Sequence, residues 1–379
     1  EAFTQWIHQE TDPHTGLLRQ GCIAPIEVDG QWTLLPYLCG ILYPIALGIL
    51  FAYLLYPVDH LLEKIGITRI LAIFISLVVG LGMLAAGFYL IIMQLNVFIE
   101  DFPELKETAL HNIQEINQEV SDDFGISVKQ QNEWLEERVS NFFATSTELF
   151  QSAFSATSST LVRLGLLPVY IFFLLYYRNK ARHFVLMVVH ERHHEKARKI
   201  LNELSDVSQH YMTGVFVVVL ILCVINSLGL MIVGVKYPVL LGVISAVFNF
   251  IPYFGTLIGG AVPLAVTFLT MDEGGYVVGV AVLFVIIQFV ENNILTPNIT
   301  GGRVKLNPYV TILSLVAGAM IWGIPGMLII VPFTAMFKIV CDHIDWLKPV
   351  GFLLGTSGTE RYALTWDKIK SFFRKKVPG

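Results

Sequence analysis

The chain has 379 residues, of which 54% are hydrophobic and only 15% are charged, and its formal net charge is −5. Soluble proteins typically carry about 25% charged residues, so the composition excludes an ordinary soluble domain. Residues 70–93 are apolar without the alternation of barrel strands. The sequence therefore predicts an all-α, polytopic integral membrane helix bundle.

Residues 1–35 are polar, and we expect an N-terminal tail that lacks the pattern of a signal peptide. Two spanning helices are predicted within residues 36–99, at 36–56 and from 70 to about 97. The four cysteines of the chain show neither metal-ligand spacing nor a disulfide framework. No metal site is therefore predicted.

The character of the chain changes at residues 100–159, which are polar and mostly acidic. Apolar residues such as Leu105, Leu110 and Ile113 recur there at helical spacing, which predicts an extramembrane insertion of amphipathic helices. Two interpretations stay open. The insertion is either a subdomain that guards an entrance or makes an oligomer contact, or a solvated connector.

Residues 160–237 are predicted to contain two further spanning helices, 161–177 and 215–235, joined by a basic loop. Cytoplasmic loops carry an excess of Lys and Arg, so we expect this loop inside and the acidic insertion outside. His190 and His194 have the i, i+4 spacing of a helix face, but the surrounding cations favour a solvated face over a metal site.

The transport core is predicted at residues 238–340, which are apolar but are broken twice by proline and glycine, at 249–255 and 322–326. The arms beside each break are shorter than the roughly 20 residues that a spanning helix needs. Such broken segments are typical of secondary transporters, and they predict two opposed re-entrant helical hairpins, one from each membrane face. Proline-kinked spans are the alternative. A cytoplasmic tail follows at residues 341–379. The predicted hairpin tips and hinges are Pro252, Gly255, Gly259, Gly260, Pro263, Pro297, Pro308, Gly323, Pro325 and Gly326.

Several motifs recur along this core: residues 251–255 with Gly259, Gly260 and Pro263, residues 288–293, Pro297, residues 307–308, and residues 323–326 with Pro332. These motifs resemble those of the AI-2E transporter family, the autoinducer-2 exporter-like proteins. The resemblance covers roughly residues 36–354 and is most specific in the C-terminal half. The family usually carries an additional apolar helix before the segment 36–56, where this chain is polar, and parity then puts the N-terminus outside.

The resemblance implies a multi-pass, α-helical transporter of the bacterial inner membrane that contacts membrane lipid and assembles as a homo-oligomer. It also implies export of a small polar solute, such as an autoinducer-2-like signal molecule. Other branches of the family are linked to antiport of a cation and a proton, so the resemblance implies this activity as the alternative.

Glu291 is the leading candidate for the transport site, because an ionisable residue inside a bilayer marks function. It follows the apolar run 277–290 and is flanked by amides that can coordinate a cation or a polar solute. Such a group could exchange a proton for another ion. The alternative is an interfacial anchor that pairs with Arg303 or Lys305. The residues predicted to line the pathway are Glu291, Asn292, Asn293, Gln288, Asn249, Asn226 and Asn307.

The sequence contains no nucleophile–base pairing, nucleotide-binding glycine loop or metal motif. We therefore expect neither an enzyme nor an ATP-driven pump, no cofactor, and no nucleic-acid partner. The leading hypotheses are a secondary exporter of a small polar solute and a cation/proton antiporter, with Glu291 as the shared site. A membrane scaffold that moves nothing is the third, and the intramembrane Glu and Asn residues argue against it.

Overall fold

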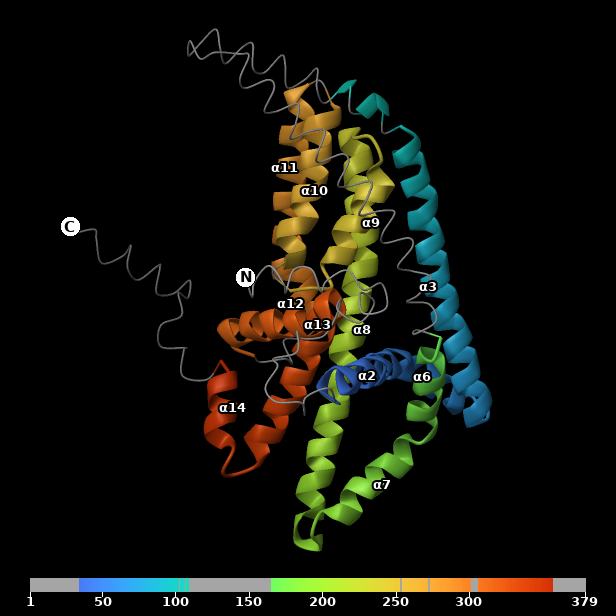
Figure 1. The fold of residues 1–379 in the computed structure, drawn as a ribbon, viewed down its shortest axis with the longest axis vertical. Coiled ribbons are helices and arrows are strands. Elements are labelled where there is room, and N and C mark those ends of the chain that lie inside the picture. The colour runs from blue at the N-terminus through green and yellow to red at the C-terminus, as the bar shows by residue number, and fades with distance from the viewer. Residues whose placement is uncertain are drawn as a thin grey trace, which may run out of the picture. The chain divides into compact units, whose positions relative to one another are not determined.

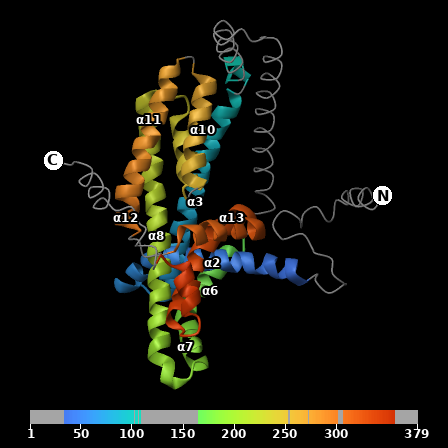
Figure 2. The ribbon, with the colours of Figure 1, turned by 90° about the vertical axis from the view of Figure 1, so that its left-hand side faces the viewer.

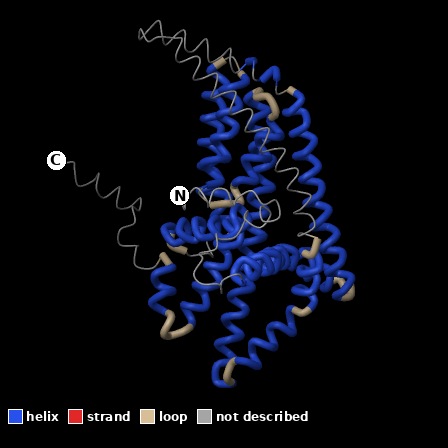
Figure 3. The backbone as a smooth tube through the Cα atoms, in the orientation of Figure 1, coloured by secondary structure: helices blue, strands red, loops and turns tan. Residues whose placement is uncertain are grey.

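The computed structural model describes residues 34–101, 103–105, 107–108, 165–252, 254–271, 273–300 and 306–356. Most of the predicted N-terminal tail, acidic insertion and C-terminal tail lies outside the described residues. The described chain is helical apart from turns and one isolated bridge (Figure 3). In chain order the helices are α2 (Leu34–Lys64), α3 (Arg69–Glu100), α6 (Leu167–Tyr176), α7 (Arg178–Val188), η3 (Glu191–His193), α8 (His194–Val233), α9 (Pro238–Phe248), α10 (Phe254–Thr270), α11 (Gly274–Val290), η4 (Glu291–Leu295), α12 (Thr296–Ile299), α13 (Pro308–His343) and α14 (Lys348–Leu354).

Within the described residues, five helices are long and apolar enough to cross a membrane. This helix content agrees with the predicted polytopic membrane bundle. The five are Leu42–Lys64, Arg69–Glu100, Glu191–Val233, Gly274–Ile299 and Pro308–His343.

Two helices are longer than the sequence predicted. α2 passes through Pro57 and ends at Lys64, since membrane helices tolerate proline where neighbouring groups satisfy the freed backbone carbonyl. α8 begins at His194 rather than near residue 215. Its first turns are rich in Glu, Lys, Arg and Leu, which have high helix propensity, so the basic loop continues into the spanning helix.

The chain divides into two compact units. The larger contains the described residues of 22–183 and 208–302, and the smaller contains those of 184–207 and 303–379. Each unit is considered by itself below.

In the larger unit a first apolar core lies where α2, α3 and α6 meet. Further core clusters join the C-terminal half of α8 to α9 and α11. Figures 1 and 2 show these helices lying alongside α10. The buried residues of the first core are Ala52, Ile73, Leu77, Leu167, Ile171 and Leu175.

α9 and α10 form an antiparallel pair whose small residues let the helices approach closely. The Ser245 hydroxyl donates to the Gly259 carbonyl oxygen at 2.5 Å, and a Cβ on Gly259 would lie 2.8 Å from the Ser245 carbonyl oxygen. α9 also packs tightly on α8, because a Cβ on Gly242 would lie 2.5 Å from the Ser227 nitrogen. The predicted break at Pro252 lies in the turn between α9 and α10.

In the smaller unit, α13 is broken at Gly323 and folds back on itself. Gly323 has φ 63° and ψ −142°, a conformation that glycine adopts and other residues avoid. Thr334 donates a hydrogen bond to Ser314 at 3.2 Å, whereas an unbroken helix would hold them about 30 Å apart. A Cβ on Gly318 would lie 2.6 Å from the Gly326 carbonyl oxygen. The two glycines therefore permit this close return.

Candidate transport site

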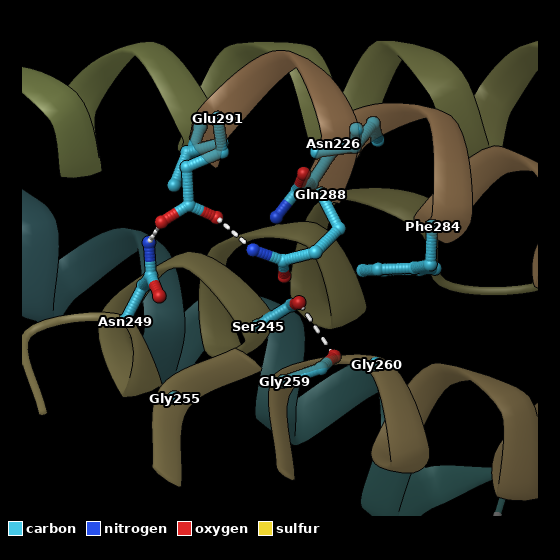
Figure 4. A pocket seen from close by; sticks show the side chains of 11 residues that line it. Asn226, Ser245, Asn249, Gly255, Gly259, Gly260, Phe284, Gln288 and Glu291 are labelled. Atoms are coloured by element: carbon cyan, nitrogen blue, oxygen red, sulfur yellow. Dashed lines mark hydrogen bonds between the residues drawn. The ribbon is translucent and has the colours of Figure 1, made fainter. Parts of the chain in front are cut away.

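Glu291 lies where α11 passes into η4, a π-helical turn. π-Helical turns are rare in proteins, and those that occur often lie at functional sites. The side chain is only 8% exposed, and it points toward α9 (Figure 4). A buried charged group is stable only when it is paired or hydrogen-bonded, so the partners of this carboxylate determine what it can do.

Both carboxylate oxygens of Glu291 accept hydrogen bonds from amides. Asn249, at the C-terminal end of α9, donates from Nδ2 to Oε1 at 2.5 Å. Gln288, one turn earlier on α11, donates from Nε2 to Oε2 at 3.2 Å. An amide carries both N–H donors and a carbonyl acceptor. The same two neighbours can therefore donate to the charged carboxylate or accept a hydrogen bond from the protonated carboxyl group.

No Lys or Arg pairs with Glu291 in the part of the chain that the structure describes. Arg303 and Lys305, the cations of the interfacial-anchor interpretation, lie outside the described residues. The observed surroundings of the carboxylate are thus polar but uncharged.

The Glu291 carboxylate faces a small pocket between α8, α9, α10 and α11 (Figure 4). The pocket volume is about 20 Å³, and one water molecule needs at least about 10–15 Å³. In this conformation the pocket has room for a water molecule or a small dehydrated cation. The lining residues are Leu222, Asn226, Ser245, Asn249, Gly255, Gly259, Gly260, Phe284, Ile287, Gln288 and Glu291.

Asn226 adds a further polar side chain to this pocket from α8. The residue is 3% exposed, and its Nδ2 makes only a long contact of 3.5 Å with the Gly242 carbonyl oxygen. Its Oδ1 accepts no hydrogen bond within the described residues. A buried acceptor without a donor is costly, and hard cations are held by oxygen ligands. Asn226 and Glu291 together therefore present oxygens suited to a cation or a water molecule.

Ser245 and Phe284 line the pocket but were missed from the sequence. The sequence indicates only that a donor is needed near Ser245: Pro263 has no N–H, so the Gly259 carbonyl four residues earlier lacks its helical donor. The Ser245 hydroxyl supplies that hydrogen bond at 2.5 Å. Phe284 lies beside Gly260 as an apolar wall, and an aromatic residue in an apolar run carries no sequence signal of this role.

Three predicted pathway residues lie elsewhere. Asn292 and Asn293 are exposed, and Asn293 donates to the Phe289 carbonyl oxygen of its own helix at 2.8 Å. Asn307 precedes α13 in the smaller unit, where its Oδ1 accepts from the Tyr309 backbone nitrogen at 3.0 Å. This is the bond of a helix N-cap. The structure thus gives Asn307 a local structural role.

The predicted tips and hinges also separate into groups. Gly255, Gly259 and Gly260 line the pocket, while Pro252 lies in the turn before α10 and Gly323 in the break of α13. Pro325 and Gly326 directly follow that break. The remaining positions lie within helices, because proline fits the first helical turn and an apolar helix can absorb one inside. They are Pro263 in α10, Pro297 in α12 and Pro308 in α13.

Comparison with known proteins gives a family. The model of the AI-2E family transporter matches residues 31–346. The Bacillus subtilis protein named "Putative transport protein YrrI" is 30% identical over 307 residues, which cover 80% of this chain and 86% of that protein. The Escherichia coli protein named "Putative permease PerM" is 24% identical over 310 residues, which cover 80% of this chain and 87% of that protein.

Proposed function

The chain belongs to the AI-2E transporter family, and from that premise we propose that it is a secondary transporter that exchanges a small cation for a proton at Glu291. As a member of this family it is a multi-pass membrane transporter and not an enzyme. The finer proposal rests on one observation. A buried carboxylate is held by two neutral amides at a pocket of about 20 Å³.

The chemistry of exchange follows from the partners of Glu291. The charged carboxylate and the Oδ1 of Asn226 are oxygen ligands of the kind that hard cations prefer. When a proton replaces the cation, the protonated carboxyl can donate to an amide carbonyl of Asn249 or Gln288 after that amide turns over. The site therefore has a stable arrangement for each bound species, and binding of one excludes the other.

Export of a small polar solute, such as an autoinducer-2-like molecule, is the second candidate. The pocket lining supports it, because Asn226, Ser245, Asn249 and Gln288 can hydrogen-bond hydroxyl and carbonyl groups. A ring-sized molecule needs a cavity of several hundred Å³. Transport of such a solute would require a state in which the pocket is much larger.

Two re-entrant hairpins, α9–α10 and the folded-back α13, are part of the proposal. Their lengths support it. α9 has 11 residues and is about 16 Å long, whereas the hydrocarbon core of a bilayer is about 30 Å thick. The charge rule supports a cytoplasmic position for the basic stretch 178–199 and for the tail 341–379, with the acidic insertion 100–159 outside. Assembly as a homo-oligomer completes this scheme.

The test is transport by the purified full-length protein in liposomes. A pH-sensitive dye inside the vesicles reports proton movement after Na⁺, Li⁺ or K⁺ is added outside. We expect at least one of these cations to drive proton movement that protein-free vesicles lack. Absence of cation-driven proton movement, together with uptake of a labelled polar solute, would overturn antiport in favour of the second candidate.

A further inference from the structure

A second pocket lies in the larger unit where α3 begins and α6 passes into α7, and it shares no residue with the Glu291 pocket. Its volume is about 490 Å³. Among the described residues the lining contains two cations, several polar groups and one aliphatic side chain, but no acidic residue: Thr68, Arg69, Ile70, Tyr176, Asn179 and Lys180. We propose that this pocket binds the phosphate headgroup of an anionic membrane lipid.

The acidic residues next to this pocket are already engaged by another arginine. Arg178 donates from Nη1 to Oδ2 of the fully buried Asp59 and from Nη2 to Oε2 of Glu63, the second bond at 2.5 Å. The Arg178 guanidinium also lies over the Tyr56 ring, 5.1 Å from its centre. Arg178 and Arg69, which also forms an ion pair with Glu63, together offset the two carboxylates and leave the charge of Lys180 available to a ligand.

Arg69 and Lys180 both line the pocket, but only Lys180 carries a charge without an acidic partner among the described residues. Arg69 donates from Nη2 to the Leu175 carbonyl oxygen at 2.7 Å, and its Nε forms an ion pair with Glu63 at 3.8 Å. Lys180 lies over the Tyr177 ring, with Nζ 5.6 Å from the ring centre. It has no ion pair among the described residues. Two cations therefore line the same cavity, and the charge of Lys180 is available to an anion.

The start of α3 adds hydrogen-bond donors of the right kind. The first N–H groups of an α-helix have no partner within the helix, and the helix dipole makes that end attractive to anions. Thr68 makes no side-chain capping bond, and the first turn of α3 contains no acidic residue. The backbone amides at Arg69 and Ile70 are thus placed at the wall of a cavity that also contains two cations.

The surroundings favour a lipid over a soluble phosphate. Phe173 and Tyr177 stack at the end of α6, with ring centres 6.0 Å apart, and tyrosines are enriched where a bilayer meets water. Ile70, Leu71 and Phe74 are each more than half exposed on α3. These apolar side chains continue from the polar pocket and give a surface for acyl chains. A ligand with an anionic head and an apolar tail matches both parts.

The charge of the neighbouring segment also favours an anionic lipid. Every second residue at the start of α7 is a cation, namely Arg178, Lys180 and Arg182. The charge rule places such a stretch on the cytoplasmic side, where the leaflet is rich in anionic lipid. Basic pockets between spanning helices on that side bind anionic headgroups.

Lipid binding can be measured by native mass spectrometry on the full-length protein after delipidation in detergent. Phosphatidylglycerol and phosphatidylcholine are added in parallel, since both carry a phosphate but only the first has a net negative charge. We expect wild type to retain phosphatidylglycerol preferentially. Equal retention of the two lipids would overturn the proposal.

The matched variants are Lys180→Glu and Arg182→Glu, which change the same charge two residues apart on one exposed helix. Of these two residues, Lys180 lines the pocket and Arg182 does not. We expect Lys180→Glu to lower phosphatidylglycerol occupancy about tenfold, Lys180→Gln to have an intermediate effect, and Arg182→Glu to stay within about twofold of wild type. Equal losses in the two Glu variants would mean general surface attraction and would overturn the site.

A third arm separates lipid from free phosphate. Millimolar inorganic phosphate is added to the protein loaded with phosphatidylglycerol. We expect the lipid to stay bound, because its acyl chains contribute binding that phosphate lacks. Complete displacement would assign the pocket to a soluble phosphate and would overturn the lipid proposal.

Discussion

Asn249 donates a hydrogen bond to Glu291 at 2.5 Å, although 42 residues separate them along the chain. The bond joins the C-terminal end of α9 to the start of η4. Any change in the charge of the Glu291 carboxyl changes what Asn249 must offer, a donor to the charged form or an acceptor to the protonated form. In the proposed exchange, binding at Glu291 would thereby be linked to the turn between α9 and α10.

Glu291→Gln should abolish exchange while the protein still folds, because the amide keeps the size and hydrogen bonding but cannot take up or release a proton. Cation-driven proton movement should fall to the level of protein-free vesicles at every pH. The control is Glu273→Gln, the same change at the exposed opposite end of α11, which should behave as wild type. Wild-type rates and an unchanged pH profile in Glu291→Gln would make Glu291 an interfacial anchor.

Asn249→Leu should weaken cation binding, because it removes a donor from the charged carboxylate and so favours the protonated form, which excludes the cation. A buried group left without its partner costs about 1–3 kcal/mol, so the half-saturating cation concentration should rise about 5- to 150-fold. The matched control is Asn293→Leu, since Asn293 is exposed and does not line the pocket. Similar shifts in both variants, measured in the liposome assay, would show that the amide at residue 249 has no special role.

The composition of the chain was enough to predict a helical membrane protein, and Glu291 stood out because it ends a long apolar run. The sequence did not show which of the consecutive polar residues Glu291, Asn292 and Asn293 faces the pocket. Gln288 and Glu291 are three residues apart and share a helix face, whereas Asn292 and Asn293 are exposed and do not line the pocket. The π-helical turn that fixes this phase depends on tertiary packing and has no simple sequence pattern.

The breaks at Pro252 and Gly323 were predicted from proline and glycine, but the same reasoning named Pro263 and Pro308, which lie within helices. A proline has no backbone N–H, so the carbonyl four residues earlier loses its helical donor. Whether the helix continues through the proline depends on which other group donates to that carbonyl. Ser245 does so for Pro263, from another helix. That donor is only identified once the packing of α9 on α10 is known.

Gly323→Ala should destabilise the smaller unit through backbone strain alone. A Cβ at Gly323 would meet nothing within 4 Å, but its φ of 63° is unfavourable for alanine. We expect a loss of about 1–3 kcal/mol in the free energy of unfolding. Gly82→Ala is the control, because Gly82 also has open space and lies in a regular helix; it should be neutral or stabilising. Equal stability of the two variants in denaturant titrations would contradict the strain.

Cysteine labelling tests the proposed orientation, with the native cysteines replaced. Gln118→Cys and Gln131→Cys, in the acidic insertion outside the described residues, should react with an impermeant maleimide in cells whose outer barrier is opened. His193→Cys, in the exposed η3 turn, should react only after the inner membrane is broken, because its basic surroundings are expected on the cytoplasmic side. The reverse pattern would invert the whole topology.

Ser245 and Pro263 should show a coupling that only their shared carbonyl explains. Ser245→Ala removes the one donor found for the Gly259 carbonyl within the described residues, and we expect it to cost about 1–3 kcal/mol in the free energy of unfolding. In a Pro263→Ala background the same change should cost much less, because alanine in place of the proline restores the helical N–H four residues after Gly259. Denaturant unfolding of the wild type, both single variants and the double variant gives the coupling energy directly. If Ser245→Ala costs the same in both backgrounds, the Ser245 hydroxyl is not a substitute for the missing proline N–H.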